Sequence, residues 1–272
     1  MPAPAFGEAF DAVLAAAQTG ESWAYQRLFD WLGRPVASYL RGAGLDDPEG
    51  TANECFLRVF GGICCDFEVG GLNPAAVEVA LRTGAKVVWM PTFSSIPDRR
   101  KLKLPGPGIA LLDQQAKPIS PLHEILRLAK QHDAVVATGH VDLPELFALA
   151  DACRELDVKL VMTHALETHV GADHTLAHVV EMAERGALIE FTYLTCMPGG
   201  FAASRDPLTF AKAMAAVDPA RAIMSTDFGQ DRSPHPAVGM RMFIDEMMRA
   251  GITAEQIDLM ARRNPARLLG LA

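Results

Sequence analysis

Three side chains that can bind a metal ion lie at the ends of three separate apolar runs. His140 ends DAVVATGH, His164 lies near the end of VKLVMTHA, and Asp227 follows RAIMST. Imidazole nitrogens and a carboxylate are the usual ligands of a catalytic zinc ion. Such an ion lowers the pKa of a bound water toward ~7, and a nearby carboxylate can take the proton. The three residues predict a metal centre with His164 and Asp227 as catalytic groups, against the alternative of hydrogen-bonded structural residues.

Three further histidines follow the same apolar runs. His169 and His174 lie in ETHVGADH, downstream of His164, and His235 lies in RSPHP, downstream of Asp227. Each of them fits either a substrate-pocket position or a solvated loop. We expect His169 and His235 to line the substrate pocket.

Two other residues near the apolar runs could contribute to a pocket. Cys196 precedes a glycine pair, which lets the backbone approach a ligand closely. No histidine is paired with Cys196 in the sequence pattern, so we interpret it as a pocket-wall residue rather than a nucleophile. Glu190 interrupts an apolar run. It fits two roles equally well, as a carboxylate that orients a metal ligand or as a buried, paired carboxylate.

These residues need a scaffold that brings strand ends together. Continuous apolar runs typical of strands buried on both faces occur at 85–92, 133–140, 158–165, 187–194 and 221–229, and a sixth strand is expected within 60–69. Helical patterns alternate with them near 74–83, 119–131, 143–156, 175–185 and 206–216. Repeated strand–helix units predict an α/β fold with a parallel sheet. In such folds the carboxyl ends of the strands form the functional face.

The first 61 residues have a different pattern. Leu28, Leu32, Val36 and Leu40 recur every four residues, as on one face of an amphipathic helix. No convincing strand occurs in this part of the chain. We therefore predict a helical segment over 1–61 and a separate α/β domain over 62–272.

Composition restricts the partners and the compartment. The net charge is −8, which argues against a nucleic-acid partner because phosphate neutralisation needs a basic face. The five scattered cysteines do not form a disulfide framework and suit buried thiols in a reducing compartment. The sequence shows neither a signal peptide nor an apolar run long enough for a membrane span. We expect a cytoplasmic protein that acts on a small molecule and not at a membrane.

The residues at the strand ends carry a family resemblance. His140, His164, Asp227 and the closing NPARLLGLA together resemble the amidohydrolase superfamily, and VGGLNPAAVEVALRTGAKVVWMPT, FTYLTCMPGGF and STDFGQ are similar to a small amidohydrolase-like family. The similarity covers about 62–272. It implies a (β/α)₈ barrel that binds one or two divalent ions, with zinc expected, and it makes Asp227 the general base. The implied activity is metal-dependent hydrolysis of an amide, ester or lactone-like bond.

The chain departs from that family in its first strands. The superfamily opens with a strand that ends in an HxH pair, and this sequence contains no HxH. We therefore predict an incomplete TIM-type barrel of about six parallel strands, with impaired activity. Two open sheet edges need backbone partners. Either the helical segment covers the gap, or the chain forms a homo-oligomer.

The segment before the barrel has a resemblance of its own. GESWAYQRLFDWLGRPVASYLRGAGLDDPEGTANECFLRVF resembles region 2 of an extracytoplasmic-function sigma factor. The resemblance implies that the acidic helix around Asp46, Asp47 and Glu49 contacts RNA polymerase core. The basic, aromatic part that would hold single-stranded DNA does not follow. An RNA polymerase-binding regulatory module, or a non-catalytic fusion, is therefore the alternative function.

Overall fold

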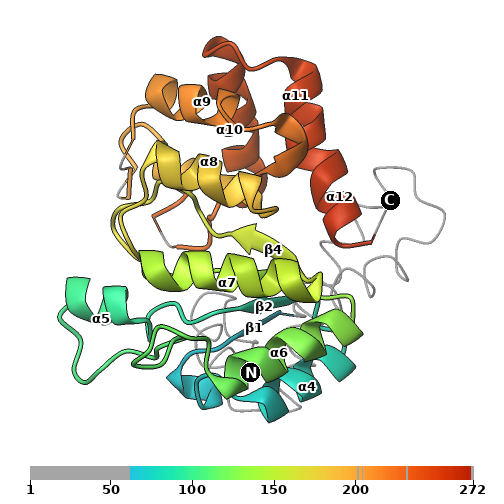
Figure 1. Cartoon of the computed structure of the whole chain (residues 1–272). Coiled ribbons are helices and arrows are strands. Elements are labelled where there is room, and N and C mark those ends of the chain that lie inside the picture. The colour runs from blue at the N-terminus through green and yellow to red at the C-terminus, as the bar shows by residue number, and fades with distance from the viewer. Residues whose placement is uncertain (1–61, 201, 204, 231, 271–272) are drawn as a thin grey trace, which may run out of the picture. The chain divides into compact units, whose positions relative to one another are not determined.

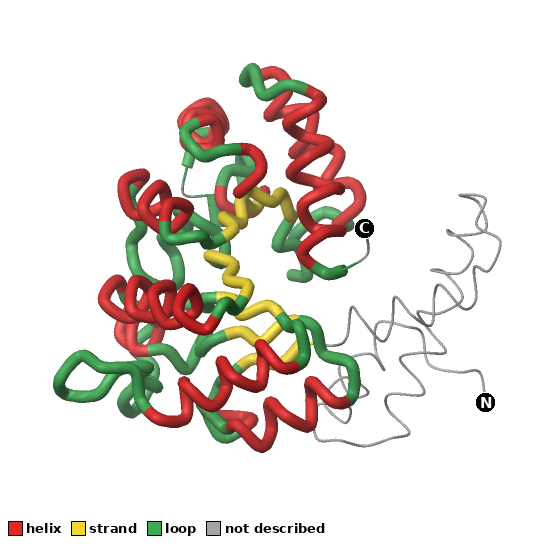
Figure 2. The backbone as a smooth tube through the Cα atoms, turned by 45° about the vertical axis from the view of Figure 1, so that its right-hand side comes forward, coloured by secondary structure: helices red, strands yellow, loops and turns green. Residues whose placement is uncertain are grey.

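A single curved sheet of parallel strands organises the part of the chain that the structure describes. The computed structural model describes residues 62–200, 202–203, 205–230 and 232–270. The strands are β1 (Gly62–Cys64), β2 (Val87–Trp89), β3 (Val135–Ala137), β4 (Lys159–Met162), β5 (Leu188–Thr192) and β6 (Ala222–Ser225). They pair in sequence order, each parallel to the next. The sheet has six strands with β1 and β6 at its two ends, and Figure 2 shows the strands as an open arc.

Helices follow the strands and cover the outer face of the arc (Figures 1 and 2). The α-helices are α4 (Pro74–Arg82), α5 (Ile96–Lys101), α6 (Ser120–Gln131), α7 (Leu143–Leu156), α8 (Leu176–Glu184), α9 (Pro207–Ala215), α10 (Pro236–Arg249), α11 (Ala254–Asp258) and α12 (Asn264–Leu268). Short turns are η1 (Phe67–Val69), η2 (Tyr193–Thr195), η3 (Pro219–Arg221) and the π-helical η4 (Leu259–Arg263). The α/β class and the incomplete barrel predicted from the sequence are confirmed.

Local signals explain where the helices begin. Proline occupies the first turn of α4, α5, α6, α7, α9 and α10, where its missing N–H costs nothing. Asp142 and Thr253 form capping boxes at α7 and α11, each of which satisfies two helix-end donors. These caps set the start of each helix, and the predicted helix positions agree with the structure. The short helix α5 was missed because it follows the strand β2 without an amphipathic repeat.

Apolar side chains on the two faces of the sheet form separate clusters. The larger one lies between the strands and the outer helices and includes Val136, Met162, Phe191 and Phe210. The smaller one comprises Val135, Ala137, Val161 and Ile223. These inward-facing residues alternate along the strands with outward-facing ones, as the two-residue period of a strand requires.

Two glycines permit close packing around β2. A Cβ on Gly62 would lie 2.4 Å from the Trp89 ring, so the ring packs directly over the β1 backbone. Gly139 has a φ of 59°, and a Cβ there would lie 2.3 Å from the Met90 carbonyl oxygen. Only glycine fits that conformation and spacing. Gly139 therefore lets the segment after β3 pass close to the end of β2.

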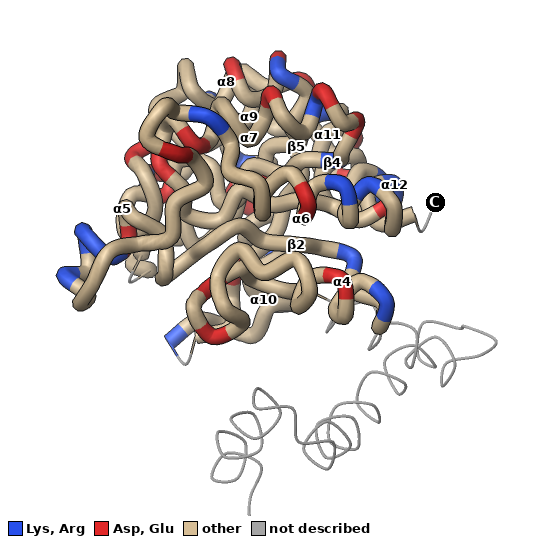
Figure 3. Tube along the Cα trace, turned by 60° about the horizontal axis from the view of Figure 1, so that its bottom comes forward, with Lys and Arg blue, Asp and Glu red and all other residues tan. Residues whose placement is uncertain are grey.

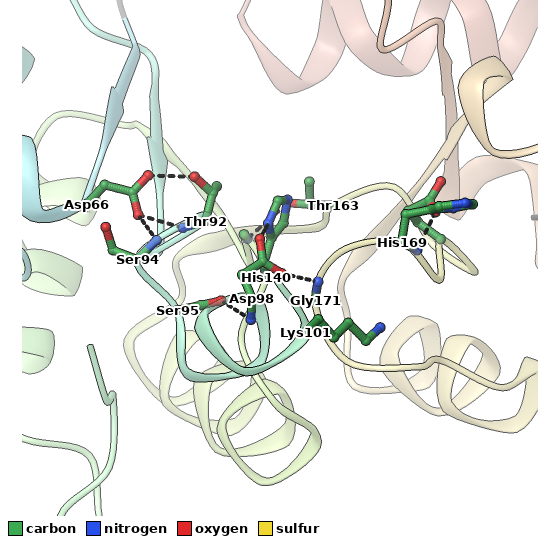
Figure 4. Close-up of polar contacts among 12 residues, drawn as sticks. Asp66, Thr92, Ser94, Ser95, Asp98, Lys101, His140, Thr163, His169 and Gly171 are labelled. Atoms are coloured by element: carbon green, nitrogen blue, oxygen red, sulfur yellow. Dashed lines mark hydrogen bonds and ion pairs between the residues drawn. The ribbon is translucent and has the colours of Figure 1, made fainter. Parts of the chain in front are cut away.

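A carboxylate ties the end of β1 to the segment after β2 (Figure 4). Asp66 accepts backbone hydrogen bonds from Thr92 (2.9 Å) and Ser94 (3.0 Å), and side-chain bonds from the Thr92 hydroxyl and the Cys64 thiol. Burial alone would raise the pKa of Asp66, but these donors outweigh it and lower the pKa. We call Asp66, Thr92, Ser94 and Cys64 the β1 clamp.

Charged residues of both signs lie side by side over the described part of the chain (Figure 3). Arg99, Arg100 and Lys101 occupy the last turn of α5, where cations interact favourably with the helix dipole. Within the described residues, no helix is both long enough and apolar enough to cross a membrane.

Candidate metal centre at the strand ends

His140 is held from behind by a buried carboxylate. Its Nδ1 lies 2.6 Å from Oδ2 of Asp98 on α5, and both side chains are buried. The Nδ1–H donates to the carboxylate, so Nε2 presents its lone pair on the opposite side of the ring. The His140 backbone N–H also donates to the Pro91 carbonyl, at 2.9 Å. His140 is therefore fixed in both tautomer and orientation, as a metal-ligating histidine requires.

The His164 ring meets His140 at that Nε2 lone pair. The two Nε2 atoms lie 2.8 Å apart, and the ring centroids are 4.8 Å apart. Burial, with His140 close by, lowers the pKa of His164 to about 4. The imidazole is therefore neutral near pH 7, which is the form that binds metal ions. Its Nδ1 is buried without a hydrogen-bond partner among the described residues. The structure thus brings together two strand-end histidines that lie 24 residues apart in the chain.

The backbone of His164 adopts an unusual conformation. Its φ is 27°, in the left-handed region that non-glycine residues rarely occupy. The backbone N–H donates to Oε2 of Glu190 at 3.1 Å, and Oε1 of Glu190 accepts from the Ser225 hydroxyl at 2.8 Å. Burial raises the pKa of Glu190, and these two donors oppose the rise. These contacts fit both roles left open for Glu190, the carboxylate that orients a metal ligand and the buried, paired carboxylate, so its role stays a prediction.

Asp227 lies at the accessible rim of the same strand ends. Its φ is 55°, so it shares the left-handed backbone of His164. The residue is exposed as a whole. Protein atoms around its carboxyl nevertheless displace water, and this loss of solvation raises the pKa of the carboxyl to about 7. The nearby negative charges of Glu190 and Glu167 raise it further, and His140 acts in the opposite direction. The negative charges of two neighbouring carboxylates therefore disfavour the ionised form of Asp227, and a cation would relieve that repulsion.

The donor set fits a divalent cation only in part. Among the described residues, no three His, Cys, Asp or Glu side chains converge closely enough to hold a metal ion. The two imidazole nitrogens do converge, and one of them is backed by a carboxylate. Asp227 interacts electrostatically with His140 without completing a three-ligand group. The described residues thus bring two imidazole nitrogens together, without a third ligand beside them.

The loop between β4 and α8 passes beside His140 and Asp98, where it carries Gly171 (Figure 4). Glu167 is buried, and its Oε1 accepts from the His169 backbone N–H (2.7 Å) and pairs with His169 Nδ1 (2.8 Å). The His169 side chain is 50% exposed, so its ring lies at the surface of the loop. The Gly171 backbone N–H donates to Asp98, the carboxylate that holds His140. The predicted pocket role of His169 stays a prediction.

The remaining predicted pocket residues lie in different surroundings. Cys196 is fully buried in the larger apolar cluster, and burial raises the pKa of its thiol well above the ordinary value. A thiol in that state is a poor nucleophile. His235 is exposed and caps α10, where its Nδ1 accepts from the Ala237 backbone N–H at 3.3 Å. Pocket roles for Cys196 and His235 stay predictions.

Asp98 is the site residue that sequence reasoning missed. It lies on a short helix that carries the charge-rich sequence IPDRRK, which resembles a solvated surface segment. The signal that was available is Ser95 before Ile96-Pro97-Asp98, since a serine N-cap and a proline in the first turn mark a helix start. Nothing in that pattern shows that Asp98 turns inward. Its full burial depends on the tertiary approach of His140 and Gly171.

A family model described as a family of unknown function, DUF6282, matches residues 50–190. The chain belongs to this family. The match begins within the segment 1–61, which lies outside the described residues together with the predicted domain boundary and the sigma-factor resemblance. No curated protein matches this chain.

Three solved structures illustrate what this chain is similar to. An amidohydrolase from Pseudomonas aeruginosa is 12% identical, with a TM-score of 0.52, over 75% of this chain and 68% of that one. An organophosphorus hydrolase variant from Deinococcus radiodurans is 15% identical, with a TM-score of 0.45, over 73% and 64%. An N-acetyl-D-glucosamine-6-phosphate deacetylase from Mycobacterium smegmatis is 14% identical, with a TM-score of 0.44, over 73% and 50%. The DUF6282 chain thus spans 50–68% of the length of these proteins, and the likeness to the first one supports the fold described above.

Proposed function

We propose that this DUF6282 protein is a metal-dependent hydrolase of the amidohydrolase type. The observation that carries the proposal is the pair of Nε2 atoms, 2.8 Å apart, with Asp98 behind one of them. His140, His164 and Asp227 would hold a divalent cation, with zinc expected. Such an ion polarises a carbonyl and lowers the pKa of a bound water.

The side chains around the pair have distinct roles under this proposal. Asp98 keeps the His140 lone pair aimed at the centre, and Glu190 holds the His164 backbone in its strained conformation. The Asp227 carboxyl, with a pKa of about 7, can accept and release a proton near neutral pH. Phe93 packs edge-on against the His140 ring, at 5.8 Å between centroids, and limits water on that side.

The substrate class follows from the fold likeness and the chemistry of the centre. A small molecule with an amide, ester or lactone carbonyl presents the electrophile that such a centre attacks. Fold alone does not choose among these bonds, because one fold hosts many substrates. The binding of a cation at the histidine pair is therefore tested first.

Elemental analysis of the purified full chain tests the proposal. We expect near-stoichiometric zinc or another divalent metal in the wild type, and little or no metal in the His140→Ala, His164→Ala double variant because both imidazole ligands are gone. His132→Ala is the matched control, because His132 closes α6 at the opposite end of β3. Equal metal content in the double variant and the control would refute the centre. A panel of amides, esters and lactones, assayed with the loaded protein, then identifies the bond.

A further inference from the structure

His174 is a buried histidine whose ring has no hydrogen-bond partner among the described residues. The residue is 6% exposed, and both Nδ1 and Nε2 are unpaired. Buried polar groups in proteins almost always have a partner, and an exception points to a bound ion, water or ligand. The neighbouring His178 differs, since its Nδ1 accepts from the Thr175 backbone N–H as part of the α8 capping box.

The loop that carries His174 is fixed on the same helix that holds His140. Lys101 on α5 donates to the Thr168 carbonyl at 2.9 Å and pairs with Asp173 at 2.7 Å. The Gly171 N–H donates to Asp98. His174 also interacts electrostatically with both His140 and His164. The loop that carries His174 is therefore anchored beside His140, and the His174 ring makes no hydrogen bond that would hold it in place.

The ring is in the chemical state that a metal ligand needs. Burial lowers the pKa of His174 to about 4, and the charges of His178 and Lys101 act in the same direction. The imidazole is therefore neutral near pH 7 and has a lone pair available. The Lys101 ammonium is balanced by Asp173, so it presents little net repulsion to a cation.

The histidine pair lacks one ligand that a catalytic site normally has. Catalytic zinc sites use three protein ligands and keep one position open. Only two nitrogens converge here, and Asp227 lies at the exposed rim. We propose that His174 rotates in as a third imidazole ligand of the cation held by His140 and His164. This inference rests on the proposed function, and it assigns the β4–α8 loop a direct part in the centre.

Cobalt titration of the full chain tests the assignment. Co²⁺ binding is followed by visible absorption, because band position and intensity report the ligands and geometry of the ion. We expect His174→Gln to weaken Co²⁺ binding 10–100-fold and to alter the spectrum. His132→Gln, at the far end of β3, should match the wild type in both. His174→Phe keeps the ring shape without nitrogens, and it replaces His174→Gln if that variant does not fold.

Each outcome separates the two proposals. Wild-type affinity and spectrum in both His174 variants would overturn the role of His174 and leave the cation centre standing. Failure of the wild type and His132→Gln to bind Co²⁺ at all would overturn the centre and, with it, this assignment. Loss of affinity in His174→Gln with an unchanged spectrum would also overturn the assignment, because a directly bound imidazole must change the spectrum when it is removed.

Discussion

Two carboxylates on the same edge of the sheet have opposite environments. Asp66, after β1, accepts four hydrogen bonds from the other residues of the β1 clamp, and its pKa is lowered. Asp227, after β6, lies near two other carboxylates, and its pKa is raised to about 7. In the first region, hydrogen bonds from the protein itself stabilise the charged carboxylate. The second accumulates negative charge, strained backbone and unpaired imidazole nitrogens in one place.

The difference separates structural from functional polar groups. A fully hydrogen-bonded carboxylate stabilises the fold and has no capacity left for a ligand. Groups that stay unpaired, or that repel one another, cost stability and persist where a ligand repays the cost. His164 and Asp227 both have positive φ, and both lie in the second region. The chemistry of the DUF6282 protein is therefore expected at the β3–β6 end of the arc.

Removal of the β1 clamp should have the largest effect on stability. Asp66→Ala leaves the Thr92 and Ser94 backbone donors without their acceptor, which costs about 2–4 kcal/mol. Urea unfolding should show a lower midpoint at an unchanged slope. Asp227→Ala is the matched control, and it should not destabilise the cation-free protein. Similar losses in both variants would remove the distinction between the two regions.

Removal of the support behind His140 should affect cation binding more than folding. Asp98→Asn loses the negative charge that fixes the His140 tautomer, and we expect 10–100-fold weaker Co²⁺ or Zn²⁺ binding, about 1.4–2.7 kcal/mol. Asp98→Glu, which keeps the charge, should recover part of the affinity. Isothermal titration measures the affinity, and thermal unfolding of the cation-free variants checks the fold. Unaltered affinity in Asp98→Asn would show that the carboxylate has only a packing role.

The smallest expected effect is on the pH dependence of the free energy of unfolding, to which Asp227 and Asp66 contribute with opposite signs. The pKa of Asp227 is about 7 in the folded protein and 3.8 for a free carboxyl, so between those values the folded state binds more protons than the unfolded state. Its contribution to stability falls as the pH rises from about 4 to about 7. The contribution amounts to about 1 kcal/mol or less, because solvent screens the exposed rim.

Asp66 should behave in the opposite way. Its lowered pKa gives a contribution that is present above 3.8 and is lost as the pH falls below that value. Urea unfolding of the cation-free protein at pH 2.5, 4, 5.5 and 7.5 measures both slopes, and Asp227→Asn should flatten the decline between pH 4 and 7. In the presence of Co²⁺ the trend should reverse, since a carboxylate must lose its proton to bind the ion. If the free energy of unfolding of Asp227→Asn falls between pH 4 and 7 as much as that of the wild type, Asp227 is not the source of the decline.

The chain's alternation of apolar runs and amphipathic segments was enough to predict the elements and their order. Runs such as VVA at β3 and AIMS at β6 are buried on both faces, and this pattern belongs to parallel strands. Short-range signals such as Thr253 with Gln256 located helix starts, because caps depend on neighbours in the sequence. Parallel strands also place their carboxyl ends on one edge, which is why His140, His164 and Asp227 could be grouped.

Other features depended on contacts between residues far apart in the chain. Asp98 reaches His140 across 42 residues and Gly171 across 73, and Lys101 reaches Asp173 across 72. No local pattern encodes such distances, because they follow from how α5 and the β4–α8 loop pack over the strand ends. The sequence by itself determined the sheet, its direction and the residue types available at its functional edge. Only the tertiary structure decided that two imidazoles meet, that a carboxylate from a short helix holds one of them, and that a third imidazole is buried nearby without a partner.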